Sequence, residues 1–96
     1  MAVYALVELK VTDRAAMGPY IDAVEETISA HGGRFLVRAG ATEVVEGDIG
    51  PYPVKVVVEF PSMDVARGWY ASREYQAILP DRLNNSTGNF IWVDGV

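Results

Sequence analysis

Two carboxylates and one arginine are the side chains of this 96-residue chain best suited to acid–base chemistry. Along a strand, side chains alternate between two faces, and Glu8, Glu59 and Arg38 each lie in one such alternating set of a strand-like segment. If the three sets share a face, repulsion between the carboxylates holds a proton on one of them, as acid–base catalysis requires. Equally, the group would form a structural ion pair at a subunit interface, with Arg38 bridging a carboxylate. In the catalytic interpretation, Glu59 is the acid–base residue and Arg38 orients it or anchors an anion.

His31 is the only histidine, and the chain has no cysteine. It follows a helical pattern directly, and a protonated imidazole at a helix C-terminus is stabilised by the helix dipole. The alternative role is proton transfer, because histidine titrates near neutral pH. One histidine without cysteines predicts no metal site. We therefore expect neither a bound metal nor a cofactor.

Four aromatic residues are candidates for the wall of a ligand cavity. They are Tyr20, Trp69, Tyr70 and Tyr75. An aromatic wall with a few polar tips is typical of small-molecule sites. The same rings would equally fill the core of a small domain, which needs large side chains. Both interpretations stay open.

The elements that must position these residues follow from periodicity, caps and breakers. Alternation predicts strands at 3–11, 34–46, 54–60 and 89–94, with a bulge at Gly40. A first helix carries the stripe Met17, Ile21, Val24 and Ile28 between a cap at Asp13 and the glycines 32–33. Ser62 and Ser72 are interpreted as caps of two later helical segments, with a kink or restart at Pro80.

The order strand, helix, strand, strand, helix, strand predicts one α+β domain over residues 1–96. Its fold class is ferredoxin-like βαββαβ, with a four-stranded antiparallel sheet and helices on one face. The segments 3–11 and 54–60 carry apolar residues on both faces. Helices cover only one face, so we expect a homodimer packed sheet to sheet, which buries the other face.

The net charge of −5 excludes several classes of partner. Nucleic acids and anionic membranes both require clustered Lys and Arg, which this chain lacks. No apolar run approaches the length of a membrane span, and no signal peptide is evident. Without cysteines or a secretion signal, we expect a cytoplasmic protein.

Several short motifs resemble one family over nearly the whole chain. They are Gly32-Gly33-Arg34-Phe35, Glu46-Gly47, Glu59-Phe60-Pro61-Ser62, Trp69-Tyr70, Ser72, Glu74-Tyr75-Gln76 and Arg82. In order and spacing they resemble the domain of unknown function 1330 family. Arg73 stands where that pattern has proline, so we expect the start of this helical segment to differ. The resemblance implies a ferredoxin-like dimeric α/β barrel and no established activity. Related dimeric barrels include cofactor-free monooxygenases, isomerases and dehydratases acting on small organic molecules.

Two hypotheses about function stay open. The first is a cofactor-free enzyme that acts on a small organic molecule by acid–base chemistry, with Glu59, Arg38 and His31 as catalytic candidates and the four aromatic residues as walls. The second is a non-catalytic homodimeric module that binds a small ligand or serves a stress-related role. A cavity reached by Glu59 or His31 would favour the enzyme. The sequence does not identify the ligand.

Overall fold

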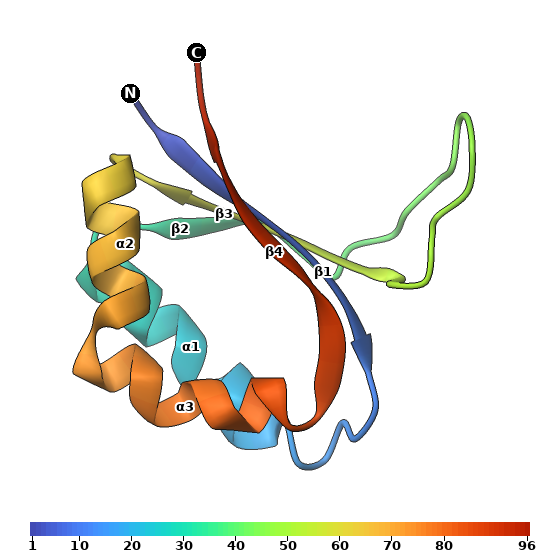
Figure 1. The fold of residues 1–96 in the computed structure, drawn as a ribbon, viewed down its shortest axis with the longest axis horizontal. Coiled ribbons are helices and arrows are strands. Elements are labelled where there is room, and N and C mark those ends of the chain that lie inside the picture. Colours follow the sequence, from blue (N-terminus) through green and yellow to red (C-terminus); the bar gives the residue numbers. More distant parts are fainter.

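Seven elements are formed in the computed structural model, which describes residues 1–96. In chain order they are β1 (Val3–Val11), α1 (Gly18–Ala30), β2 (Arg34–Arg38), β3 (Val54–Phe60), α2 (Met63–Ala71), α3 (Arg73–Leu83) and β4 (Ser86–Asp94). Figure 1 shows the helices gathered on one side of the sheet, and the segment between β2 and β3 extending away from the body. The two termini lie near each other at one end of the sheet (Figure 1).

The four strands form one sheet in the order β2-β3-β1-β4, and every neighbouring pair is antiparallel. This is the ferredoxin-like arrangement, and β1 and β3 are its central strands, as expected. None of the helices combines the length and apolarity that crossing a membrane requires.

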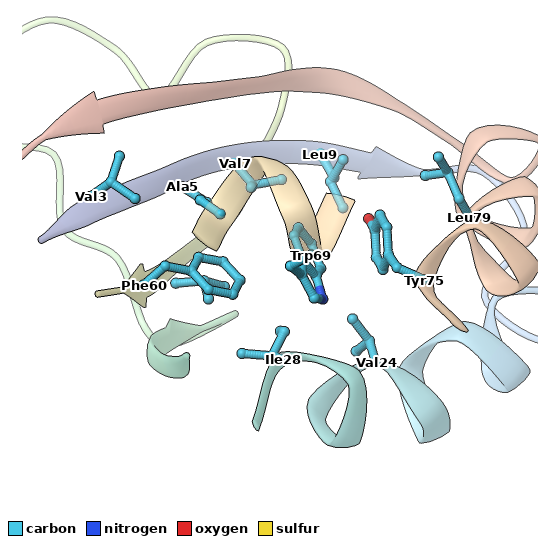
Figure 2. Packing of buried hydrophobic residues seen from close by; sticks show 12 residues of the cluster. Val3, Ala5, Val7, Leu9, Val24, Ile28, Phe60, Trp69, Tyr75 and Leu79 are labelled. Atoms are coloured by element: carbon cyan, nitrogen blue, oxygen red, sulfur yellow. The ribbon is translucent and has the colours of Figure 1, made fainter. Parts of the chain in front are cut away.

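The core lies between the sheet and the helices. Alternation along β1 directs Val3, Ala5, Val7 and Leu9 toward the helices, and all four are buried. Trp69 projects from α2 into the middle of this layer (Figure 2). Glycine is required at position 33, which lies against the Phe60 ring. A Cβ there would lie 2.6 Å from this ring, so no larger residue fits without displacing it.

The helix caps follow the sequence pattern closely. Ser62 Oγ accepts a hydrogen bond from the Val65 amide and caps α2, and Ser72 Oγ accepts one from the Tyr75 amide and caps α3. Asp13 instead caps a short turn, because its carboxylate accepts from the Ala16 amide at 3.1 Å. α1 itself begins only at Gly18, with proline in its first turn.

Four features differ from the prediction. β2 ends at Arg38 rather than near residue 46, and residues 39–53 form an exposed loop. The bulge lies between Phe35 and Val37, not at Gly40. α3 continues through Pro80 to its end at Leu83. β4 begins three residues earlier than predicted, because it pairs with β1 along its whole length.

One face of the sheet is not covered by helices. An apolar row crosses all four strands of this face, since Val37 pairs with Val57, Val57 with Leu6, and Leu6 with Ile91. Leu6, Val37 and Ile91 are among the exposed large hydrophobic residues. This open face is therefore the apolar surface that the sequence pattern anticipates.

Candidate ligand-binding cavity

A cavity of about 300 Å³ lies between the helix-facing side of the sheet and the helices. Fifteen of its eighteen lining residues are hydrophobic. The apolar wall consists of Val7, Leu9, Val11, Met17, Tyr20, Ile21, Val24, Ile28, Phe35, Ala39, Val54, Val56, Val58, Trp69 and Phe90. The other three lining residues are Arg14, Arg38 and Arg82. A concave, mostly apolar space with a few polar groups is where a ligand-binding site is first sought.

The four predicted wall residues divide into two groups. Tyr20 and Trp69 line the cavity, whereas Tyr70 and Tyr75 do not. Tyr75 is fully buried, and its ring centroid lies 3.9 Å from that of Trp69. Tyr70 packs against Tyr75 at 5.4 Å between centroids. The aromatic residues therefore serve both purposes that the sequence left open, two as cavity wall and two as packing behind it.

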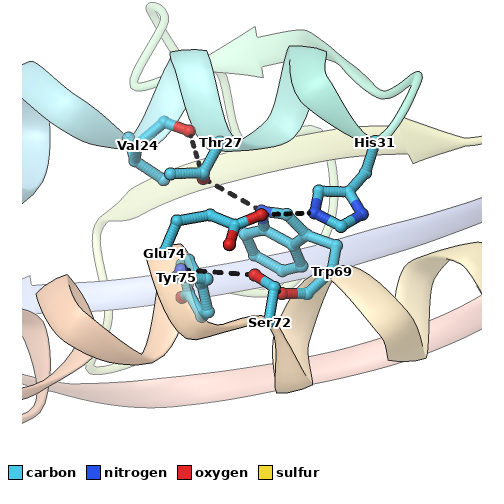
Figure 3. Close-up of polar contacts among 7 residues, drawn as sticks. All are labelled: Val24, Thr27, His31, Trp69, Ser72, Glu74 and Tyr75. Atoms are coloured by element: carbon cyan, nitrogen blue, oxygen red, sulfur yellow. Dashed lines mark hydrogen bonds and ion pairs between the residues drawn. The ribbon is translucent and has the colours of Figure 1, made fainter.

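A buried hydrogen-bond chain fixes the orientation of Trp69. Its indole Nε1 donates to Thr27 Oγ1 at 3.0 Å, and the Thr27 hydroxyl donates to the Val24 carbonyl at 2.7 Å. Figure 3 shows these contacts linking α1 to the last turn of α2. On the other side, Ser72 Oγ donates to the Trp69 carbonyl at 2.6 Å while it caps α3. Trp69, which forms part of the cavity wall, is thus held both by its indole nitrogen and by its backbone carbonyl.

Tyr20 and Tyr75 meet beside the cavity with 2.8 Å between their hydroxyl oxygens. Burial raises the pKa of Tyr20 far above its ordinary value, and the neighbouring Tyr75 raises it further. Burial also raises the pKa of Tyr75, although Arg82 opposes this effect. Both side chains are therefore neutral at physiological pH. They can donate or accept hydrogen bonds, but they cannot act as tyrosinate bases.

Arg82 completes this cluster and is the residue that sequence reasoning missed. Its side chain is buried, and its guanidinium carbon lies 5.8 Å from the Tyr20 ring centroid and 5.5 Å from that of Phe90. Burial works against its charge, but the nearby Tyr75 and Tyr20 outweigh this, so its pKa is raised above the ordinary value. A signal was present, because Arg82 follows Tyr75 by seven residues and Leu79 by three, on the same stripe of α3.

Arg38 lies on the helix side of the sheet, and the prediction that it shares a face with Glu8 and Glu59 is wrong. The bulge makes Leu36 an extra residue, so Arg38 pairs with Val56, which faces the helices. Its guanidinium donates to the Ile21 carbonyl at 2.7 Å and lies 4.5 Å from the Phe35 ring centroid. Arg38 is therefore a cavity residue, but it cannot orient Glu59.

The two carboxylates lie on the open face and pair separately. Glu59 accepts a hydrogen bond from Arg34 Nε at 3.1 Å. Glu8 accepts from Lys55 Nζ at 2.7 Å and from Asn89 at 3.0 Å. The hydrogen bond from Lys55, followed by that from Asn89, holds the pKa of Glu8 below its ordinary value. Each carboxylate thus has its own partner, and neither lines the cavity on the other side of the sheet.

His31 stands at the end of α1, as predicted, and also lies outside the cavity. Its Nε2 lies 2.8 Å from Glu74 Oε1 (Figure 3). The hydrogen bond with His31 is the main reason that the pKa of Glu74 is lowered. The contact ties the end of α1 to the start of α3. No group of three or more His, Asp or Glu side chains is placed to hold a metal ion.

The fold and cavity define a small ferredoxin-like protein in which an apolar space lies under the helix-covered side of the sheet. The chain belongs to the family described as domain of unknown function (DUF1330), which matches residues 2–96. No curated protein matches the chain.

Solved structures with the same fold include three informative neighbours. A protein of unknown function from Rhodopseudomonas palustris has a TM-score of 0.79 at 11% identity, over 99% of this chain and 82% of its own. A dimeric ferredoxin-like protein of unknown function from Jannaschia sp. CCS1 has a TM-score of 0.77 at 10% identity, over 99% of this chain and all (100%) of its own. SnoaB, a cofactor-independent oxygenase from Streptomyces nogalater, has a TM-score of 0.67 at 12% identity, over 99% of this chain and 93% of its own. At these identities the likeness shows the fold.

Proposed function

We propose that this protein is a homodimeric binding protein for a small, largely apolar organic molecule held in the cavity between sheet and helices. The cavity itself carries the proposal. Its volume of about 300 Å³ lies at the lower end of the range for ligand pockets, roughly 300–1,000 Å³. It is about twice the roughly 150 Å³ of an engineered apolar cavity that binds benzene. A molecule with one or two rings therefore fits.

Burial of the open face supports the homodimer. The row Val37, Val57, Leu6 and Ile91 is flanked by the pairs Glu59–Arg34 and Glu8–Lys55, which satisfy their charges within one sheet. A second copy can thus cover the row without separating these four charges from their partners. Dimeric ferredoxin-like neighbours support homodimer formation. Closure of the two sheets into a barrel, and the expected cytoplasmic location, stay predictions.

A cofactor-free enzyme is the second candidate function. It is favoured by the presence of hydroxyl and guanidinium groups in the wall, from Tyr20 and Arg38, and by the shared fold with a cofactor-independent oxygenase. Glu59 and His31 stay catalytic predictions, but neither lines the cavity. An enzyme of this geometry would work mainly by stabilising negative charge on its substrate, since the wall offers no carboxylate or imidazole.

Thermal-shift and tryptophan-fluorescence titrations with small aromatic compounds test ligand binding, because Trp69 lines the cavity. A bound compound is expected to raise the melting temperature and change the emission. Val54→Phe should fill the cavity from β3 and abolish both signals. Val45→Phe, on the exposed loop, is the matched control and should bind normally. Equal binding by both variants would show that the compound binds elsewhere.

Glu59→Gln separates the two candidate functions once a ligand is known. For a binding protein, the variant should lose only about 1 kcal/mol of stability, because its partner Arg34 is largely exposed and the pair lies beside the apolar row rather than within it. Ligand affinity should not change. If a turnover assay is found and Glu59→Gln abolishes turnover in a folded dimer, the enzyme is correct and the cavity is not its whole active site.

A further inference from the structure

The charged groups in the cavity wall all have the same sign. Its three charged lining residues are arginines, Arg14, Arg38 and Arg82, and no Asp or Glu lines it. The chain as a whole has 13 acidic and 8 basic side chains. A positively charged, apolar space is therefore set inside a negatively charged protein. Clefts with one sign of charge and low-dielectric walls concentrate ligands of the opposite sign.

Arg82 is the most informative of the three. Only 6% of its surface is exposed, and its Nε has no hydrogen-bond partner. None of the ion pairs in the structure includes it. Taking a charge out of water is costly unless an opposite charge and hydrogen bonds compensate it. The rings of Tyr20 and Phe90 supply part of this compensation, but no anion does.

Resting on the proposed function, we propose that the ligand of this cavity is a small organic carboxylate with an apolar body, and that Arg82 binds its carboxylate. Arg82 lines the cavity, and its planar guanidinium can engage both oxygens of a carboxylate, while no protein group satisfies its Nε. The hydrophobic wall then surrounds the apolar body. A bound carboxylate would provide the negative charge that the protein itself does not place beside Arg82.

The other two arginines have distinct secondary roles in this arrangement. Arg38 already donates to the Ile21 carbonyl and lies 3.7 Å from Glu25, so its charge already has a partner within the protein. Arg14 is exposed and forms no ion pair. We expect Arg14 to attract the anion electrostatically and Arg82 to hold it.

The test compares matched probes that differ only in charge. Benzoate, phenylacetate and 1-naphthoate are titrated at pH 7 against the wild-type protein, each beside its primary amide. Binding is followed by thermal shift and tryptophan fluorescence. We expect the carboxylates to bind about 10- to 100-fold more tightly than the amides, as for a charged hydrogen-bonded pair. Arg82→Met should remove this preference, so that each carboxylate binds no more tightly than its amide.

Two further variants keep the test decisive if Arg82→Met does not fold. Arg82→Lys retains the charge but loses the two-pronged contact, and should reduce the preference severalfold. Arg14→Met alters an exposed residue, so the variant should fold normally. It should weaken carboxylate binding, and this loss of affinity should be larger at low salt than at high salt, because salt screens exposed charges.

Three results would overturn these proposals. Amides and carboxylates binding equally well in the cavity would overturn the carboxylate inference and leave the proposed function standing. A carboxylate preference that survives in folded Arg82→Met, or that is undiminished in folded Arg82→Lys, would also overturn it. No binding of any probe in either form would overturn the proposed function together with the inference.

Discussion

Thr27→Val tests whether the Trp69–Thr27 contact fixes the cavity wall. Trp69 is 2% exposed, so without the hydroxyl its indole N–H would be buried without an acceptor. Such a group costs about 1–3 kcal/mol. In a domain of this size, 1 kcal/mol lowers the melting temperature by about 4–8 °C. We therefore expect Thr27→Val to lower it by roughly 5–20 °C, although valine has nearly the same shape as threonine.

The measurement is urea unfolding followed by tryptophan fluorescence, with thermal unfolding at one fixed protein concentration because a dimer's melting temperature depends on concentration. Thr27→Ser is the matched control. It keeps the hydroxyl and loses one methyl group, at a cost of about 0.8 kcal/mol. If Thr27→Val proved as stable as Thr27→Ser, the hydrogen bond would not be what holds Trp69.

Three further predictions concern the interface, acid stability and packing. Ile91→Arg should dissociate the proposed dimer in sedimentation equilibrium. Leu83→Arg, at a similarly exposed position on α3, is the control and should not. Unchanged association of Ile91→Arg would place the interface elsewhere. Lys55 lowers the folded-state pKa of Glu8, so this group stabilises the fold above its ordinary pKa of about 4.5 and ceases to do so as pH falls through the lowered value. Glu8→Gln should therefore flatten the loss of stability between pH 7 and pH 3 in urea unfolding, and an equally steep loss would contradict this. Gly33→Ala should destabilise by about 1–3 kcal/mol through overpacking, and a neutral effect by calorimetry would show that the contact relaxes.

The sequence allowed most of the fold to be predicted because the relevant signals are local. Alternation predicted the strands 3–11 and 54–60, which are the two central strands of the sheet, and both Ser62 and Ser72 cap helices as expected. The family motifs agree with the observed topology and with the match over residues 2–96. Caps and alternation depend on neighbours a few residues away, so one sequence is enough to reveal them.

The candidate site was harder to predict because it depends on register and on distant neighbours. Strict alternation through Leu36 assigned Arg38 to the same face as the carboxylates. Only the observed pairing of β2 with β3 reveals that Leu36 is an extra residue. Arg82 looked like an ordinary polar residue near the end of a helix. Its spacing from Tyr75 and Leu79 places it on the inner stripe of α3, but its burial also needs α3 to pack against α1 and β4.

The bulge in β2 also has a consequence for how this family can diverge. Because Leu36 is the extra residue, its loss would leave Val37 opposite Val57 and Arg38 opposite Val56, as they are now. A deletion elsewhere in an evenly alternating strand would exchange its two faces. In homologues, we therefore expect a gap at Leu36. Loss of this residue would keep the side chain of Arg38 in the cavity wall and Val37 in the apolar row of the open face.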